Sequence, residues 1–203
     1  MKEILKKHFQ ENYKNYFILM FIFIIGLIIG ICCVNNMETE SKKELNEYLT
    51  NITTQIKENK QIDYTNLLRQ SITSNLKFLA IIVFISFSMW GEIATIILIG
   101  YKGFGVGYSI SSAIAIFGTG KGLLFAVSLI CLSEIIFIPA IFYITVLSMK
   151  KYKTLMYEKE DNKWLIIKHY LIALLAVIII LIISSLIQTY LNNNLFLLFK
   201  QYY

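Results

Sequence analysis

Two glutamates, Glu92 and Glu134, lie within long apolar stretches of this 203-residue chain. A carboxylate in the middle of a bilayer costs about 2.5–3.5 kcal/mol on insertion scales, so its presence needs a reason. If each stretch spans a membrane, a rise of about 1.5 Å per residue puts both carboxyl groups roughly 17–21 Å below the outer surface. Such acids either relay protons or ions, or stay neutral and join helices by hydrogen bonds. We favour the second interpretation, because a transporter normally carries more intramembrane charge.

Three serines between these glutamates are their expected partners. Ser109, Ser111 and Ser112 belong to a stretch that runs in the opposite direction through the membrane, and they fall near the same depth. A hydroxyl group both donates and accepts hydrogen bonds, so it can satisfy a carboxyl group in either protonation state. We therefore expect an intramembrane polar cluster of Glu92, Glu134 and these serines.

The chain offers little for catalysis. It has two histidines, His8 and His169, and no metal-protease, serine-hydrolase, Walker or Cys-x-x-Cys motif. The segment 118–122 is Gly-Thr-Gly-Lys-Gly, which lacks the spacing of a phosphate-binding loop. Cys32 and Cys33 lie in an apolar run and are expected to be buried. The sequence thus predicts a protein that is not an enzyme, with no catalytic residue, cofactor or metal site.

Small residues recur every four positions in one apolar stretch. Gly103, Gly107, Ser111 and Ala115 fall on one helical face. A second, shorter pattern, Gly26-x-x-x-Gly30, lies near the N-terminus. In lipid, helices associate where small side chains let two backbones approach closely. These two stripes are therefore predicted to be helix-packing faces.

The composition is that of a membrane protein. Apolar residues make up 57% of the chain, the mean hydropathy is +0.63, and there is one proline. The net charge of +6 comes from lysines that cluster at the ends of apolar stretches, which favours lipid over nucleic acid as the partner. We predict an all-α polytopic membrane protein with five transmembrane helices, at residues 16–34, 76–99, 104–117, 123–149 and 165–187.

Within this scheme, Trp90-Gly91-Glu92 interrupts the second span, and a tight loop at Gly100–Gly103 precedes the third. The third span is short, so it and the start of the fourth could form a re-entrant hairpin. Pro139 is expected to kink the fourth span, since it removes a backbone hydrogen bond.

Residues 35–75 form the longest polar segment. Ser41-x-x-Glu44 has the spacing of a capping box. An apolar face follows at helical spacing, which predicts an amphipathic helix. This helix either lies on the bilayer surface or docks an extracytoplasmic protein; the candidate partner face comprises Leu45, Tyr48, Leu49, Ile52 and Ile56.

Lysines in short loops mark the cytoplasmic side of a membrane protein. Residues 1–15 carry four lysines and the loop 150–164 carries five. Five spans place both on one side, so the N-terminus is predicted to be cytoplasmic. The segment 35–75 and the tail 188–203 are then extracytoplasmic.

Four segments resemble the stage II sporulation protein M family of spore-forming bacteria. The layout of five spans with a large loop after the first is similar as well. The triplet Leu132-Ser133-Glu134 departs from the Pro-polar-Asn usual in that family, which makes Glu134 a local peculiarity. The matching segments are Lys102-Gly103-Phe104-Gly105-Val106-Gly107-Tyr108, Gly120-Lys121-Gly122-Leu123-Leu124-Phe125-Ala126, Ile135-Ile136-Phe137-Ile138-Pro139-Ala140 and His8-x-x-Glu11-Asn12.

The resemblance implies a role in engulfment of the forespore by the mother cell. The protein would be a non-catalytic scaffold for stage II sporulation proteins D and P, which cut peptidoglycan, at the septal or engulfing membrane. The expected partners are these proteins and membrane lipid, with a homo-oligomer left open. The alternative is a permease-like subunit of an ABC transporter that works with a separate ATPase. A small protective membrane protein, such as one for bacteriocin immunity, is a third interpretation.

Overall fold

The computed structural model describes residues 8–57, 64–88, 90–127, 132–157 and 163–191, and this described part contains helices and no strand. Its elements, in chain order, are α2 (Tyr13–Asn35), α3 (Thr39–Lys57), α4 (Tyr64–Ser86), α5 (Gly91–Phe117), α6 (Thr119–Ala126), α7 (Leu132–Tyr157), α8 (Lys163–Leu186) and the π-helical turn η2 (Ile187–Leu191).

Five helices are long and apolar enough to cross a membrane, which confirms the predicted all-α class and number of spans. They lie at Tyr13–Asn35, Tyr64–Ser86, Gly91–Phe117, Ser133–Lys150 and Ile166–Tyr190. Large apolar side chains point outward from several of them; Phe84, for example, is 83% exposed. Such faces would be unfavourable in water but suit a hydrocarbon solvent. The protein is therefore a multi-pass membrane protein.

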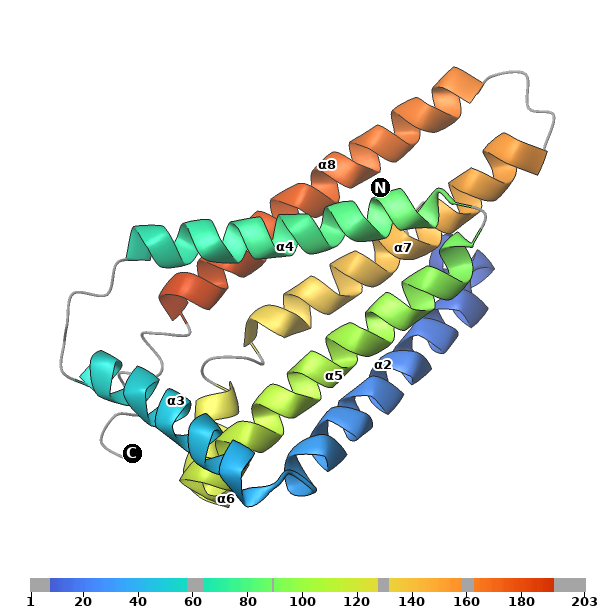
Figure 1. Ribbon diagram of the computed structural model, residues 1–203. Helices are drawn as coiled ribbons and strands as arrows, with labels where there is room; N and C mark the ends of the chain where they lie inside the picture. The colour runs from blue at the N-terminus through green and yellow to red at the C-terminus, as the bar shows by residue number, and fades with distance from the viewer. Residues whose placement is uncertain (1–7, 58–63, 89, 128–131, 158–162, 192–203) are drawn as a thin grey trace.

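The five spans form an elongated bundle with two distinct ends (Figure 1). We call one the α3 end, because α3 lies across it, beside the end of α5, the helix α6 and the end of α8. At the opposite end lie the start of α2, the end of α4, the end of α7 and the start of α8. Helix α7 is the central element, since 56% of its span is buried, against 11–28% of the others.

The break between the second and third spans differs from the prediction. The chain turns between the end of α4 at Ser86 and the start of α5 at Gly91, and the Gly91 amide donates a hydrogen bond to the Ser88 carbonyl over 3.0 Å. Residues 100–103, predicted to form a loop, lie inside the continuous helix α5. Glycines permit either a turn or close helix packing, and here Gly103 packs against the α2 backbone. The second span, α4, begins at Tyr64, within the predicted polar segment.

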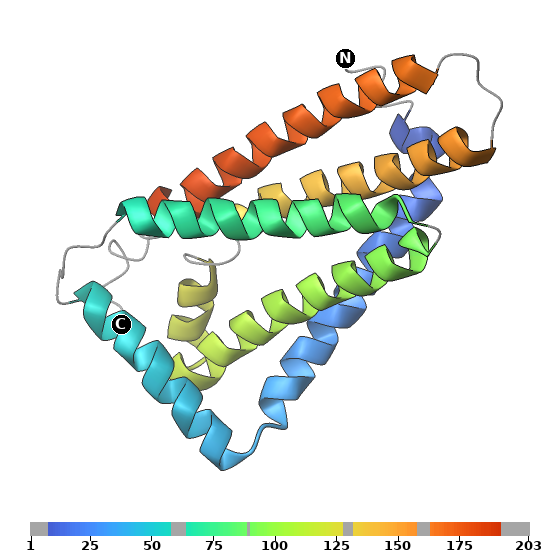
Figure 2. The same ribbon diagram turned by 45° about the horizontal axis from the view of Figure 1, so that its top comes forward.

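The predicted fourth span also differs, because two helices replace one. Gly118 ends α5 with a backbone φ of +81°, a left-handed value that favours glycine. Helix α6 then folds back toward the middle of the bundle (Figure 2), and Gly122 packs against the α5 backbone at Ala113. Helix α7 starts at Leu132 and continues through Pro139. The predicted third span, 104–117, is thus the second half of α5 rather than a separate crossing.

Candidate functional site

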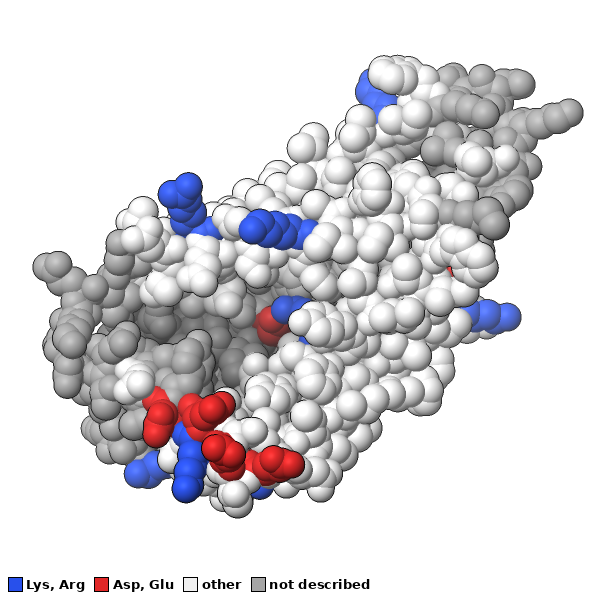
Figure 3. Space-filling view, viewed as in Figure 1, with Lys and Arg blue, Asp and Glu red and all other residues white. Residues whose placement is uncertain are grey.

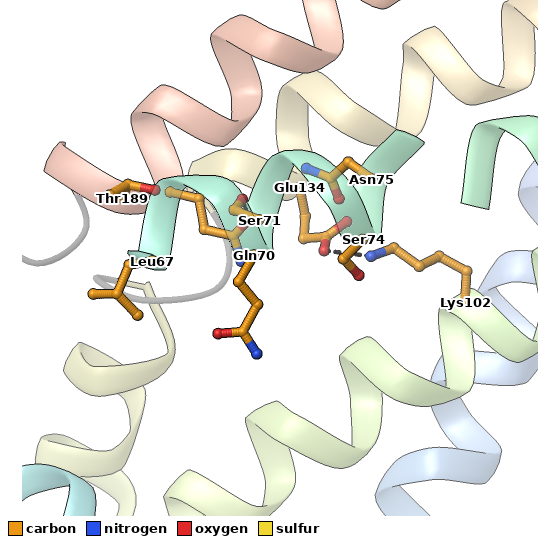
Figure 4. A pocket seen from close by; sticks show the side chains of 9 residues that line it. Leu67, Gln70, Ser71, Ser74, Asn75, Lys102, Glu134 and Thr189 are labelled. Carbon is orange, nitrogen blue, oxygen red and sulfur yellow. Dashed lines mark hydrogen bonds and ion pairs between the residues drawn. The ribbon is translucent and has the colours of Figure 1, made fainter. Parts of the chain in front are cut away.

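An ion pair joins two spans inside the bundle. The Lys102 ammonium of α5 donates a hydrogen bond to Glu134 Oε1 of α7 over 2.6 Å, with the two side chains 25% and 18% exposed. The same ammonium lies 4.5 Å from the ring centre of Phe137, one turn further along α7, which adds a cation–π contact. The pair is drawn in Figure 4, where Lys102 reaches across from its own helix to α7.

The pair accounts for a charge that would otherwise be costly in this setting. A lone ionised side chain within a membrane span is unfavourable, and pairing with an opposite charge lowers that cost. The second carboxylate oxygen, Glu134 Oε2, is buried and has no hydrogen-bond partner among the described residues. Unpartnered buried oxygens are rare in folded proteins, so this pair is only partly satisfied.

A cavity surrounds the pair and has two adjoining chambers. The first, of about 400 Å³, lies toward the α3 end, and the second, of about 480 Å³, lies along α5. Figure 3 shows a hollow in the surface above α3, with one blue and one red side chain in its depth. Ser74, Asn75, Lys102 and Glu134 line both chambers. The first chamber is completed by Leu67, Gln70, Ser71, Gln188 and Thr189, and the second by Phe78, Tyr101, Phe104, Gly105, Val106, Tyr108, Ser109 and Phe137.

Polar side chains hold the wall of the first chamber together. Ser71 donates a hydrogen bond to Gln188 Oε1 over 2.6 Å, and the Asn75 amide donates to the Ser185 hydroxyl over 2.9 Å. The first bond joins α4 to η2, and the second joins α4 to α8. The turn η2, at Ile187–Leu191, continues α8 in π-helical geometry, a form often found at functional sites. The wall is therefore a specific polar interface between spans.

A second interface, between α2 and α5, is built from glycines. A Cβ atom on Gly26 or Gly30 would collide with the backbone of α5, at Gly100 and Phe104. A Cβ atom on Gly103 or Gly107 would collide with the backbone of α2. The two predicted stripes thus lie against each other at four positions. Close backbone contact of this kind is typical of association between spans.

The last two residues of the longer stripe, Ser111 and Ala115, differ in burial. Ser111 is buried, but Ala115 is exposed, so the packed face ends about one turn before the end of α5. Pro139 is exposed within α7.

The predicted polar cluster differs from the observed one. Glu92 is exposed in the first turn of α5, at the end opposite α3, about ten residues or roughly 15 Å from Lys102 along the helix axis. Two of the three serine hydroxyls bond to their own helix: Ser109 donates to the Gly105 carbonyl and Ser112 to the Tyr108 carbonyl. The two glutamates therefore lie at different depths, because the helix break falls at residues 87–90 rather than 100–103.

Lys102 is a functional residue that the sequence did not reveal. The predicted elements place it in a loop, where a lysine needs no partner, whereas it lies within α5. The available signal was Glu134 itself, since an intramembrane acid should have a basic partner within reach. Among the described residues, no three His, Cys, Asp or Glu side chains are grouped so as to hold a metal. Cys32 and Cys33 are exposed free thiols, contrary to the expected burial, because that face of α2 points away from the bundle.

Helix α3 carries the candidate partner face. Leu45 is half-buried, whereas the side chains of Tyr48, Leu49, Ile52 and Ile56 lie outside the described residues. Acidic side chains gather over α3 beside the hollow (Figure 3). They are exposed and comprise Glu38, Glu40, Glu44 and Glu47.

Comparison with known proteins gives one match. The family model described as stage II sporulation protein M matches residues 19–192 of the chain. No curated protein and no solved structure matches. The matched region contains all of α3 to α8 and most of α2.

Proposed function

The chain belongs to the stage II sporulation protein M family, and on that premise we propose that this sporulation-related membrane protein is a non-catalytic scaffold. It anchors peptidoglycan hydrolases and localises them at the septal membrane while the mother cell engulfs the forespore. The expected clients are stage II sporulation proteins D and P. A tether of this kind acts by raising the local concentration of its clients at the membrane, so it needs no chemistry of its own.

The observation that carries the proposal is helix α3. It is a 19-residue helix outside the five spans, it lies across one end of the bundle, and it packs against α5. Its described charged side chains are exposed. A polar helix held at the membrane with much of its surface uncovered is suited to contact a protein outside the lipid.

The predicted orientation supports this use of α3. Lys14, Lys150 and Lys168 all lie toward the end opposite α3. By the positive-inside rule that end is cytoplasmic, so α3 faces the compartment that contains peptidoglycan. Reporter fusions after Met1 and Tyr203 test this orientation and should report opposite sides of the membrane. A C-terminus on the same side as the N-terminus would contradict it.

Affinity purification in mild detergent from sporulating cells tests the scaffold role. The wild-type protein should retain stage II sporulation proteins D and P. A variant with Leu45→Ser, Leu49→Ser and Ile52→Ser should lose them and block engulfment, because the apolar face of α3 is removed. Lys43→Ser with Glu47→Ser, which changes the polar side of the same helix without altering net charge, should retain both proteins.

Two results would count against the proposal. The first is normal engulfment by the triple variant while the protein remains in the membrane. The second is recovery of a cytosolic ATPase in place of the hydrolases, which would favour the permease alternative.

A further inference from the structure

We propose that the cavity between α4, α5 and α7 binds the phosphate-bearing headgroup of a membrane lipid, with the Lys102 ammonium as the phosphate-binding group. The acyl chains of this lipid lie in the second chamber and along the groove between α4 and α5. This site is separate from α3 and goes beyond the scaffold function.

The two chambers differ in chemistry in the way that an amphiphile requires. Amide and hydroxyl side chains, among them Gln70, Ser71 and Gln188, line the first chamber. Aromatic and aliphatic side chains, among them Phe78, Phe104 and Phe137, dominate the second. The ion pair lies where the chambers meet, since its residues line both. A ligand with a polar head and an apolar body fits this arrangement better than a small ion or a sugar.

The charged groups favour an anionic head. An ammonium group has three N–H donors, and one of them is directed at Glu134 Oε1. The Lys102 side chain is the more exposed of the pair, whereas Glu134 Oε2 is buried. A ligand in the cavity therefore meets donors before it meets the unpartnered carboxylate oxygen. Phosphate oxygens accept charge-assisted hydrogen bonds from such a group, and the exposed Ser74 beside it adds a hydroxyl (Figure 4).

The position of the cavity points to the membrane as the source of the ligand. Helices α4 and α5 separate progressively from their shared turn at residues 87–90 toward the α3 end (Figure 2). Two residues of the second chamber, Tyr101 and Gly105, are exposed on the lipid-facing side of α5. A Cβ atom on Gly105 would meet nothing within 4 Å. There is thus room for a chain to leave the chamber sideways between two spans.

Native mass spectrometry of the full-length protein in detergent tests the proposal with three probes: a short-chain phosphatidylglycerol, the diacylglycerol of the same chain length, and inorganic phosphate. We expect phosphatidylglycerol to bind about tenfold or more tightly than diacylglycerol, as a charge-assisted phosphate contact implies. Inorganic phosphate should not displace it. Equal binding of the two lipids, or displacement by phosphate alone, would overturn the lipid-headgroup assignment.

Matched variants locate the site. Lys102→Gln combined with Glu134→Gln removes both charges but keeps amides that can bond to each other, and it should abolish the preference for phosphatidylglycerol. Ser74→Leu keeps the ion pair and fills the cavity, so it should weaken binding of both lipids even if the double variant does not fold. Lys77→Gln, on the same helix but outside the cavity, should bind as the wild type does. An unchanged lipid preference in the double variant, or unchanged lipid binding by Ser74→Leu, would refute the site.

Discussion

Helix α5 contacts its neighbours in two opposite ways. Against α2 it packs through glycines, and the two backbones touch over several turns. Toward α4 it diverges and leaves a cavity that contains a charged pair. The residues for both faces alternate within one short segment: Gly103 and Gly107 face α2, whereas Lys102 and Gly105 face the cavity.

This difference shows how one helix can be held in place by close packing on one face while its other face lines a cavity. Association between spans in lipid depends on close packing, because burial of apolar surface there brings no hydrophobic gain. The α2–α5 interface supplies that packing and holds α5 in place. The opposite face can then carry a polar group such as Lys102, which pairs with Glu134 but packs less closely against its neighbours.

The largest effect should follow from a large side chain in the glycine interface. Gly107→Leu puts a branched side chain where the α2 backbone at Leu27 now lies. We expect the free energy of unfolding to fall by more than about 3 kcal/mol, the upper end of ordinary overpacking, and little folded protein to remain in the membrane. Gly105→Ala is the control, since that position has open space and alanine favours the helix. Membrane accumulation and thermal denaturation in detergent are measured for both variants. Equal stability of the two would show that the α2 face of α5 is no more closely packed than its cavity face.

Breaking the ion pair on one side should be the next largest effect. Lys102→Met leaves Glu134 without its cation in a poorly solvated site, at a cost of about 3 kcal/mol, the low end for a buried pair because both side chains are partly exposed. Lys102→Gln with Glu134→Gln should recover much of this loss, because neither side chain is charged. Thermal denaturation of the purified proteins checks the order wild type, double variant, single variant. A single variant as stable as the wild type would show that the pair is solvated.

A smaller effect should separate two residues of the same stripe. Ser111 is buried, so Ser111→Leu is expected to destabilise the bundle by about 1–3 kcal/mol. Ala115 is exposed, so Ala115→Leu should be nearly neutral. The same denaturation assay compares them. If Ala115→Leu were the more damaging, the packed face would extend further along α5 than the structure places it.

The smallest effect should come from Glu92. This residue is exposed in the first turn of α5, where a negative charge interacts favourably but weakly with the helix dipole. Glu92→Gln should therefore change stability by less than about 1 kcal/mol and leave lipid binding unaltered. Loss of engulfment from this substitution at normal protein level would instead give Glu92 a role in function.

Much of the architecture could be predicted from the sequence, and the error at the candidate site has one cause. Apolar stretches and lysine-rich connections were enough to predict five spans, because the bilayer requires about 20 apolar residues for each crossing. The predicted position of the break between the second and third spans was wrong, because the sequence does not show which glycine, Gly91, Gly100 or Gly103, lies beside a turn. Only Gly91 follows a turn, and packing against α2 keeps the other two in a helix. Because of this error, the prediction placed Lys102 in a loop outside the membrane and Glu92 in the middle of a span.

The sequence by itself determined the class of the protein, its small-residue stripes and the presence of an acid that needs a partner, because composition and helical spacing are local properties. Only the tertiary structure decided which stripe meets which, that Lys102 is the partner of Glu134, and that α4 and α5 enclose a two-chambered cavity. These features depend on contacts between α5 and helices distant along the chain. The free energy of such contacts is set by how closely two backbones approach in space, which residue spacing along one helix does not specify.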